Sequence, residues 1–500
     1  MKRRTFLKTA SVTAFAAAAP RALGHCGSCA ADAKPAKKVN IIYIMADDLG
    51  YGDLSCYGQK KFKTPNIDKL ATEGMRFTQH YSGSTVCAPT RCSLMTGKHT
   101  GHCFVRGNRE VRPVGQAPMP ANTVTIAKLL KKAGYATGMF GKWGLGFPGS
   151  TSAPNAMGFD EFYGYNCQRN AHTYYPEHLF HNDTKVPLDG KTYSHDLIMA
   201  EALKFVTANK DKPFFCYLPV TIPHAAMHVP EQYVAPFRKK FPQFEDKIGR
   251  YSGPAVKNPI AAFAGMMTKL DEDVARLMTL LKDLGIDDNT IVMFTSDNGP
   301  HLEGGHDPHF FNSNGPLNGH KRDLTEGGIR MPLIVRWPGK IKPATTSDHI
   351  SAHWDFLATA CEIAGVTPTK DTDGISYLPE LLGQSDTQKQ HDYLYWEFPS
   401  AGGKRAARMD HWKAVQTDIH NQENPPIKLY NLRDDLGETK DIAAKYPKIV
   451  GLMRDIFEDA HTDSALFPLK FRPAAKKKKP KADKKKPKVD KKKKAKPSKQ

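Results

Sequence analysis

Two apolar segments are each followed by a pair of side chains that carry oxygen atoms: residues 39–46 by Asp47 and Asp48, and residues 290–295, after Ser296, by Asp297 and Asn298. Apolar runs of this kind are typical of buried parallel strands, and such strands end at one edge of an open sheet, where ligands bind. Adjacent carboxylates repel each other unless a cation neutralises them. Three carboxylates and one amide oxygen form a hard site suited to Ca²⁺. We therefore predict one Ca²⁺ ion held by Asp47, Asp48, Asp297 and Asn298.

A reactive group for such a site is offered by residues 84–97, in which Cys87-Ala-Pro-Thr-Arg91 is followed by an apolar pair and Thr-Gly. On its own, this short motif is also compatible with a buried structural cysteine before a turn-forming proline, because free cysteines are among the most buried residues. The other motifs of the chain decide between the two interpretations.

Three further blocks follow in order. The segment 140–146, Phe-Gly-Lys-Trp-Gly-Leu-Gly, contains Lys142; His224 follows a short aromatic strand at 213–219; and the block 319–332 contains Lys321. Together with the cysteine block and the acidic pairs, these motifs resemble the type I, arylsulfatase-like sulfatases of the alkaline phosphatase superfamily. The resemblance extends over residues 38–465. For the lysines and the histidine taken singly, a surface or core position is the alternative.

The resemblance implies a specific chemistry. A maturation enzyme would oxidise Cys87 to formylglycine, whose hydrated aldehyde is the nucleophile and a further ligand of the Ca²⁺ ion. Arg91, Lys142 and Lys321 would offset the charge of the sulfuryl group, and His224 would protonate the leaving oxygen. The implied activity is that of a sulfuric ester hydrolase.

One position departs from the family. Arylsulfatases have a histidine two residues after the lysine of the 140–146 block, and this chain has Gly144. The family uses that histidine to hold the formylglycine diol and to accept its proton. His172, in an aromatic loop, and His301, just after Asp-Asn-Gly-Pro, are the candidates for another base. Either one could instead be a hydrogen-bonded loop histidine or a substrate contact.

Two other functions remain open. Phosphodiesterases and phosphonate hydrolases of the same superfamily share the fold and the metal geometry but have no general need for the cysteine block. A non-catalytic relative that binds sulfated glycans would be favoured if Gly144 reflected loss of activity. Exported bacterial sulfatases of this kind commonly act on sulfated polysaccharides or oligosaccharides, and we expect such a substrate. The sugar, the linkage and the oligomeric state stay open.

The net charge of +21 comes mostly from the two ends of the chain, since residues 1–29 carry five basic and no acidic side chains and residues 476–500 carry fifteen lysines and two aspartates. The remainder is nearly neutral, so no nucleic-acid partner is required.

Arg3-Arg4 before an alanine-rich stretch resembles a twin-arginine signal, and residues 22–24 offer small residues for cleavage. We therefore expect export to the periplasm or the medium, without a transmembrane segment. Cys26 is a weaker candidate for a lipid anchor.

Alternating strand and helix patterns predict an α/β fold, with a large, mostly parallel sheet flanked by helices. From about residue 386, short strands without intervening helices predict a small antiparallel sheet, closed by a helix at 447–461. A helix at 123–133 is also expected, with Val124 on its apolar face. The expected units are a signal and the start of a linker (1–29), a catalytic domain (30–385), a small α+β subdomain (386–475) and a disordered lysine-rich tail (476–500). The tail could bind a polyanion or simply aid solubility.

Overall fold

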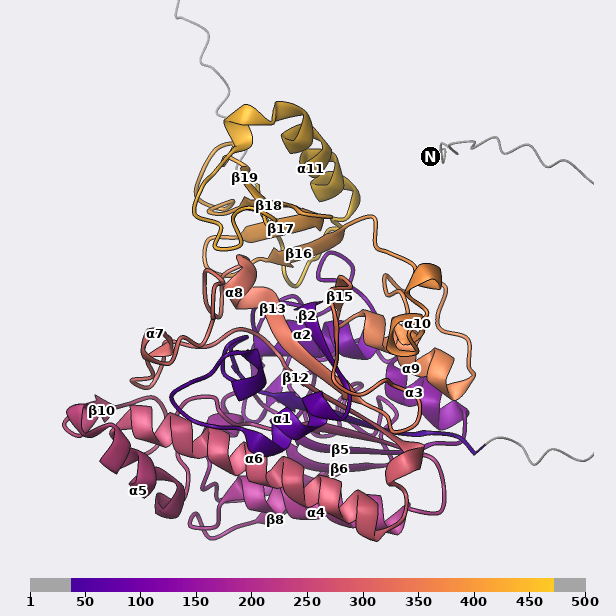
Figure 1. The fold of residues 1–500 in the computed structure, drawn as a ribbon, viewed down its shortest axis with the longest axis vertical. Coiled ribbons are helices and arrows are strands. Elements are labelled where there is room, and N and C mark those ends of the chain that lie inside the picture. Colours follow the sequence, from indigo (N-terminus) through magenta and orange to yellow (C-terminus); the bar gives the residue numbers. More distant parts are fainter. Residues whose placement is uncertain (1–36, 472–500) are drawn as a thin grey trace, which may run out of the picture. The chain divides into compact units, whose positions relative to one another are not determined.

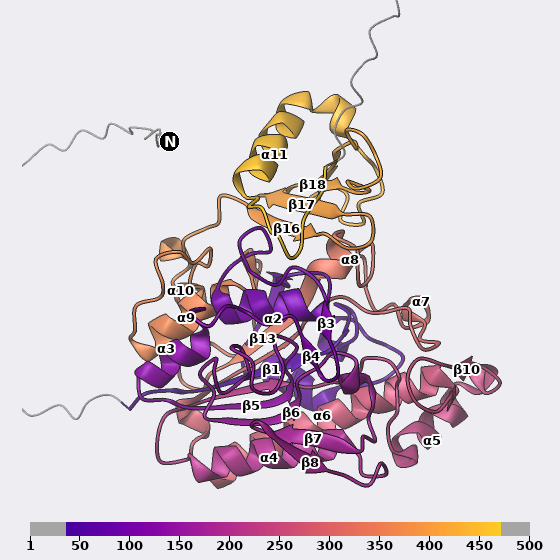
Figure 2. The same ribbon diagram turned by 180° about the vertical axis from the view of Figure 1, so that it is seen from behind.

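An eleven-stranded mixed sheet forms the centre of the fold (Figures 1 and 2). The computed structural model describes residues 37–471, so the signal-like segment, Cys26 and the lysine-rich tail lie outside the described residues. In order across the sheet, the strands are β14 (Thr345–Ser347), β2 (Met75–Tyr81), β13 (Arg330–Arg336), β12 (Thr290–Ser296), β1 (Asn40–Ala46), β9 (Phe214–Pro219), β5 (Ala136–Lys142), β6 (Glu161–Tyr165), β7 (His178–His181) and β8 (Thr184–Pro187). A further strand, β15 (Ser351–Ala352), pairs with β2.

Parallel pairing is continuous through the centre of this sheet, from β12 through β1, β9 and β5 to β6. Antiparallel pairing begins toward the two edges, where β13 pairs with β12 and β7 pairs with β6. The predicted mostly parallel sheet flanked by helices is therefore confirmed. The carboxyl ends of its central strands all meet at one edge, which is where α/β sheets carry their ligands.

Alternate side chains of β1 enter two different cores. Ile42 and Ile44 pack in one core, whereas Ile41, Tyr43 and Met45 pack in the other, as the period of two along a strand requires. The first core is covered by α1 (Pro65–Thr72), α4 (Ser194–Ala208) and α6 (Pro259–Asp283), with α5 (Glu231–Lys240) packed on α6; the second is covered by α2 (Cys87–Thr96), α3 (Ile126–Lys132) and α9 (Asp355–Ala364). The central strands are thus buried on both faces, which explains why they are apolar throughout.

A second, four-stranded antiparallel sheet follows at the C-terminal end of the described chain. It consists of β16 (Leu394–Phe398), β17 (Lys404–Met409), β18 (Trp412–Gln416) and β19 (Lys428–Asn431), and α11 (Pro447–Asp459) covers one face. On the other face, Trp396 packs with Tyr81 and Trp354, and its indole N–H donates to the carbonyl of Ser82 at 2.9 Å. The predicted small sheet and helix are confirmed, whereas the exact boundary at residue 386 remains a prediction.

The helix expected at 123–133 begins later than predicted. It starts at Ile126, because the side chain of Thr125 accepts a hydrogen bond from the backbone N–H of Lys128 and so caps the helix. Val124, expected on its apolar face, precedes the helix and is 41% exposed. The remaining short elements are β3 (Glu110–Val111), β4 (Gly115–Gln116), β10 (Ile248–Gly249), β11 (Val256–Lys257), α7 (Pro308–Phe311), α8 (Glu326–Ile329) and α10 (Leu378–Leu381). Within residues 37–471, none of the helices has the length and apolar character needed to cross a membrane.

Candidate active site

The two predicted pairs of oxygen-bearing side chains meet at one edge of the sheet. Strands β1 and β12 pair in parallel and end level with each other, so both deliver their next residues to the same place. Asp48 turns the chain with a left-handed φ of 63°, a conformation that aspartate tolerates. Its backbone N–H donates to Oδ1 of Asp297 at 3.0 Å, which ties the two strand ends together. The fully buried side chains gathered here are Asp47, Asp48, Asp297 and Asn298.

Helix α2 brings the cysteine and the arginine of its motif to these carboxylates. Cys87 is the first residue of the helix, and its Sγ lies 3.5 Å from Oδ1 of Asp47. Arg91 lies one turn later on the same helix face. Its Nη2 is 2.8 Å from Oδ2 of Asp297, and its Nη1 donates to the backbone carbonyl of Lys142 at 2.7 Å. The motif spacing therefore places a thiol and a guanidinium on one side of the acidic cluster.

Two buried lysines pair with the two adjacent aspartates. Lys142 ends β5, and its Nζ lies 2.5 Å from Oδ2 of Asp47 and 3.3 Å from Sγ of Cys87. Lys321, from a loop between β12 and β13, has its Nζ 2.7 Å from Oδ2 of Asp48. Both lysines are buried, so the alternative of surface lysines is wrong for both.

Burial and charge act against each other in this cluster. Burial alone would raise the pKa of Asp47, but Lys142, followed by His224 and Arg91, holds that pKa well below its usual value. Burial and the neighbouring charge of Asp47 raise the pKa of Asp297 to about 7. A cation among these oxygens would remove the cost of ionising all three carboxylates. Burial and Asp47 also raise the pKa of the Cys87 thiol, so the unmodified thiol is not an activated nucleophile at neutral pH.

Three histidines line the site. The ring of His172 stacks on that of His224, with centroids 4.3 Å apart and an angle of 7° between the planes. His301 is a second neighbour, with its ring centroid 5.7 Å from that of His224. Both of the candidates for the missing base are therefore next to His224. Tyr251 also contacts His172 and His224, at 5.1 and 5.7 Å between centroids, and no motif in the sequence distinguished this tyrosine.

The hydrogen bonds of His224 determine its tautomer. Its Nδ1 faces the backbone carbonyl of Ala225, which can only accept, so the neutral ring carries its proton on Nδ1. Its Nε2 lies 2.9 Å from Nζ of Lys321 and 3.2 Å from Oδ2 of Asp48. Burial and the charge of Lys321 lower the pKa of His224 well below its usual value. The ring therefore presents a lone pair to the lysine ammonium.

The oxygen atoms at the strand ends fit a bound cation. The side-chain Nδ2 of Asn298 donates to Oδ1 of Asp48 at 2.7 Å and to the carbonyl of Gly299 at 2.9 Å, which fixes the orientation of the amide. Its Oδ1 is then buried without a hydrogen-bond partner among the described residues. A buried acceptor of this kind requires a partner, and a metal ion supplies one. Ligand atoms of Asp47, Asp48, Cys87 and His224 also lie within 4.8 Å of one another.

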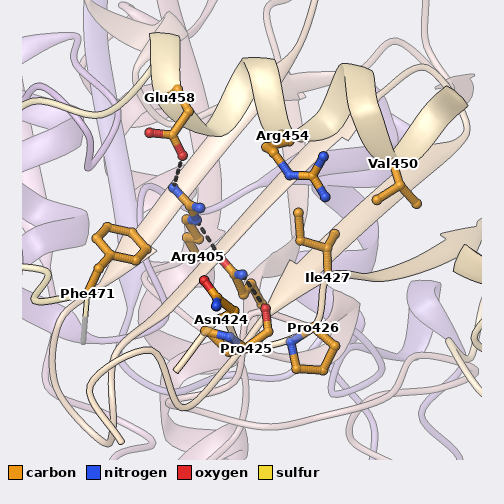
Figure 3. A pocket seen from close by; sticks show the side chains of 10 residues that line it. Arg405, Asn424, Pro425, Pro426, Ile427, Val450, Arg454, Glu458 and Phe471 are labelled. Atoms are coloured by element: carbon orange, nitrogen blue, oxygen red, sulfur yellow. Dashed lines mark hydrogen bonds and ion pairs between the residues drawn. The ribbon is translucent and has the colours of Figure 1, made fainter. Parts of the chain in front are cut away.

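A surface cavity of about 530 Å³ lies elsewhere, in the C-terminal subdomain (Figure 3). Helix α11 and the loop at 424–427 form its walls, and Arg405 at its centre is already paired with Gln416 and Glu458. The cavity shares no lining residue with the cluster at the strand ends. The chemistry of the molecule is therefore concentrated at the sheet edge, where sequence motifs from distant parts of the chain meet.

This fold and site define a hydrolase of the alkaline phosphatase superfamily. Residues 39–366 match the family model described as Sulfatase, and residues 319–461 match the model described as N-sulphoglucosamine sulphohydrolase, C-terminal. The chain thus belongs to the sulfatase family, and it is a sulfuric ester hydrolase of the type I, arylsulfatase-like class. The expected family and fold are confirmed.

Relatives with defined names support this assignment. Arylsulfatase A of Homo sapiens is 31% identical over 84% of this chain and 87% of its own length. The N-acetylgalactosamine-6-O-sulfatase of Bacteroides thetaiotaomicron is 29% identical over 85% of this chain and 94% of its own length. Among solved structures, Ps i-CgsB in complex with k-i-k-neocarrahexaose is 28% identical, covers 85% of this chain and 93% of that chain, and has a TM-score of 0.71. The phosphonate monoester hydrolase of Agrobacterium radiobacter, at 20% identity and a TM-score of 0.60, shares the fold alone.

Proposed function

We propose that this protein removes sulfate from a sulfated carbohydrate, with a formylglycine made from Cys87 and one Ca²⁺ ion held by Asp47, Asp48, Asp297 and Asn298. The observation that carries the proposal is the position of Cys87 Sγ, 3.5 Å from Oδ1 of Asp47 and 3.3 Å from Nζ of Lys142, in a buried and charged site. The carbohydrate class is supported by the relatives named above, one of which was solved in complex with a neocarrahexaose.

Formylglycine, when hydrated, would supply a hydroxyl nucleophile at the position that Sγ has here, and the calcium ion would polarise the sulfate oxygens. The side chains of the chain would bind and orient the ester. Lys142 contacts Asp47 and Cys87, Lys321 contacts Asp48, and Arg91 contacts Asp297. These three cations would offset the negative charge that builds up on the sulfuryl group.

We propose that the pair of His224 and Lys321 serves the leaving oxygen. Nε2 of His224 and Nζ of Lys321 are 2.9 Å apart, so the lysine ammonium donates a hydrogen bond to the imidazole, and its remaining protons would be available to the departing sugar oxygen. His172 and His301 flank His224 and are the candidates for the base that accepts the proton of the nucleophile when sulfate is expelled. Neither is the structural equivalent of the family's histidine at position 144.

Maturation and export belong to the same proposal. A formylglycine-generating enzyme would have to modify Cys87, which is buried in the folded chain and must therefore be reached before folding. We propose that the twin-arginine-like segment then directs the folded protein out of a bacterial cytoplasm. A non-catalytic binding protein would have no use for the aldehyde, and phosphodiesterases and phosphonate hydrolases have no general need for the cysteine block.

The test combines mass spectrometry with a substrate panel. The peptide that contains Cys87 should carry an aldehyde, and the protein should release sulfate from sulfated polysaccharides, oligosaccharides or aryl sulfates. A phosphonate ester and a phosphodiester serve as comparison substrates. An unmodified cysteine together with no sulfate release from the panel would contradict the proposal.

A further inference from the structure

The segment after β5 leaves a space next to Lys142 that another part of the chain fills. Gly144 has a φ of 77°, and a Cβ atom at this position would lie 1.8 Å from Nε2 of Gln168. Trp143 packs into the core against Phe159, with ring centroids 5.9 Å apart. Gly144 follows the end of β5 by two residues, and its backbone N–H donates to the carbonyl of Asn166 at 3.2 Å. The amide of Gln168 therefore stands where a side chain of residue 144 would begin.

This amide and that of a neighbour are buried without partners. Gln168 is 4% exposed and Asn166 is 2% exposed, and the side-chain oxygen and nitrogen of both residues have no hydrogen-bond partner among the described residues. By contrast, the buried side chain of Gln388 makes three hydrogen bonds, to Glu380, Ser376 and Lys389. Buried amides are ordinarily paired, so four amide atoms without a protein partner in two nearby side chains point to a polar partner from outside the chain, either a ligand or water.

The two amides lie on a segment that runs along the active site. They follow β6, whose last residue, Tyr165, is paired with Lys142. The backbone carbonyl of Asn166 accepts a hydrogen bond from the N–H of Gly144 at 3.2 Å. The same segment continues to His172, which stacks on His224. The unpaired amides thus lie on the segment that joins the strand paired with Lys142 to the histidine pair.

We propose that Gln168 and Asn166 form a neutral polar subsite that binds the sulfate ester group next to Cys87. This inference rests on the function proposed above. The amide N–H groups would donate to sulfuryl oxygens, and the amide oxygens would accept from hydroxyl groups of the sugar or of the nucleophile. Because an amide does not ionise at neutral pH, the subsite binds without adding charge and cannot take up a proton. Gln168 therefore replaces the binding role of a histidine at 144, and a different residue serves as the base.

The first experiment measures the affinity for inorganic sulfate by calorimetry in the full-length Cys87→Ala protein, with and without Gln168→Ala. We expect at least a tenfold loss of sulfate affinity in the double variant. Its melting temperature should fall less than that of the matched control Gln388→Ala, because Gln168→Ala loses packing but no hydrogen bond to the protein. In the matched control Gln388→Ala, sulfate affinity should be unchanged and the melting temperature should fall. The subsite would be overturned if sulfate affinity is unchanged without Gln168. It would also be overturned if the loss of affinity comes with a fall in melting temperature as large as in the control.

The second experiment tests whether Gln168 occupies the space at Gly144. Gly144→His should lower the melting temperature strongly. Gly144→His combined with Gln168→Gly should recover part of that loss. The backbone strain at residue 144 is the same in both variants, and only the clash with the side chain of Gln168 is relieved. The single variant Gln168→Gly serves as the reference for the effect of that substitution by itself. If Gly144→His and the double variant melt at the same temperature, the inference is contradicted. If sulfate binding depends on Gln168 but the protein hydrolyses no sulfate ester, the proposed function is wrong and the subsite is retained. If the protein hydrolyses sulfate esters but binds sulfate equally well without Gln168, the subsite is wrong and the proposed function is retained.

Discussion

The ammonium nitrogen of Lys321 lies 2.9 Å from Nε2 of His224, although the two residues are far apart in the sequence. The imidazole cannot donate at this nitrogen while its Nδ1 proton faces the carbonyl of Ala225. Lys321 is therefore the donor of the pair, and it also contacts Asp48 at 2.7 Å. The arrangement connects the proposed proton donor for the leaving group to one of the proposed metal ligands.

Replacing Lys321 by Met should reduce kcat/KM by about 10²- to 10⁴-fold, the usual contribution of a positioned proton donor. Since burial and the charge of Lys321 both lower the pKa of His224, loss of the lysine should raise that pKa. The limb of the pH profile that reports His224 should then move to higher pH. Lys239→Met, at an exposed position of α5, is the control. An unchanged pH profile in the Lys321 variant would argue against coupling of the two residues.

Cys87→Ala should abolish sulfate release, because the nucleophile is lost, while the ion pair between Lys142 and Asp47 stays in place. The cost in stability should be about 1 kcal/mol, the usual size for a single substitution. Sulfate release and thermal unfolding of the two proteins provide the comparison. Substantial turnover by the variant would be incompatible with a formylglycine nucleophile.

Removal of the proposed calcium ion should lower both the rate and the melting temperature. Asp47, Asp48 and Asp297 would keep their ion pairs with Lys142, Lys321 and Arg91, but their mutual repulsion would no longer be screened by the metal. Free metal at 100 times its Kd would stabilise the fold by about 2.7 kcal/mol. Elemental analysis first verifies that the metal has gone, and thermal unfolding then follows its stepwise return. The variant Asp297→Asn lacks one charged ligand, so its melting temperature should rise less when the metal is returned. A melting temperature that does not change between the metal-free and metal-loaded protein would contradict the site.

Stability should also depend on pH through Asp53, a buried carboxyl outside the cluster. Burial raises its pKa to about 7, and its Oδ1 has no hydrogen-bond partner in the described part of the chain. The pKa of Asp53 in the folded protein lies above its value of about 3.9 in the unfolded chain. The contribution of Asp53 to the free energy of unfolding is therefore fully present below about pH 3.9 and is lost as the pH rises through about 7. Asp53→Asn cannot ionise, so it should be more stable than the wild type at pH 8, by up to about 4 kcal/mol.

Urea unfolding at pH 5 and pH 8 measures this difference, with the exposed Asp211→Asn as the control. The Asp53 variant should lose less stability than the wild type between the two pH values. Equal losses would mean that Asp53 is ionised in the folded protein throughout this range.

Much of the fold could be predicted from local patterns. The apolar run that becomes β1 and the one that becomes β12 are strands because a segment buried on both faces must be apolar throughout. Their parallel pairing could be anticipated from the alternation of strands and helices, and with it the meeting of Asp47 and Asp297. Helix α2 could not be predicted in the same way, since Pro89 and the polar residues around Cys87 show no helical periodicity. It forms because its whole surface is buried between other elements.

Residue types and order along the chain were thus sufficient for the family, the fold class and the residues that come together at the sheet edge, but not for Tyr251, Gln168 or Asn166. The tertiary structure alone decided which of them touch: the contact of Lys321 with His224, the stacking of His172 on the same ring, and the amide of Gln168 in the space beside Gly144. Such contacts depend on the packing of loops that join different strands. Periodicity in the sequence does not predict these contacts, because a loop residue is positioned by the elements on either side of it and by the side chains that already fill the space.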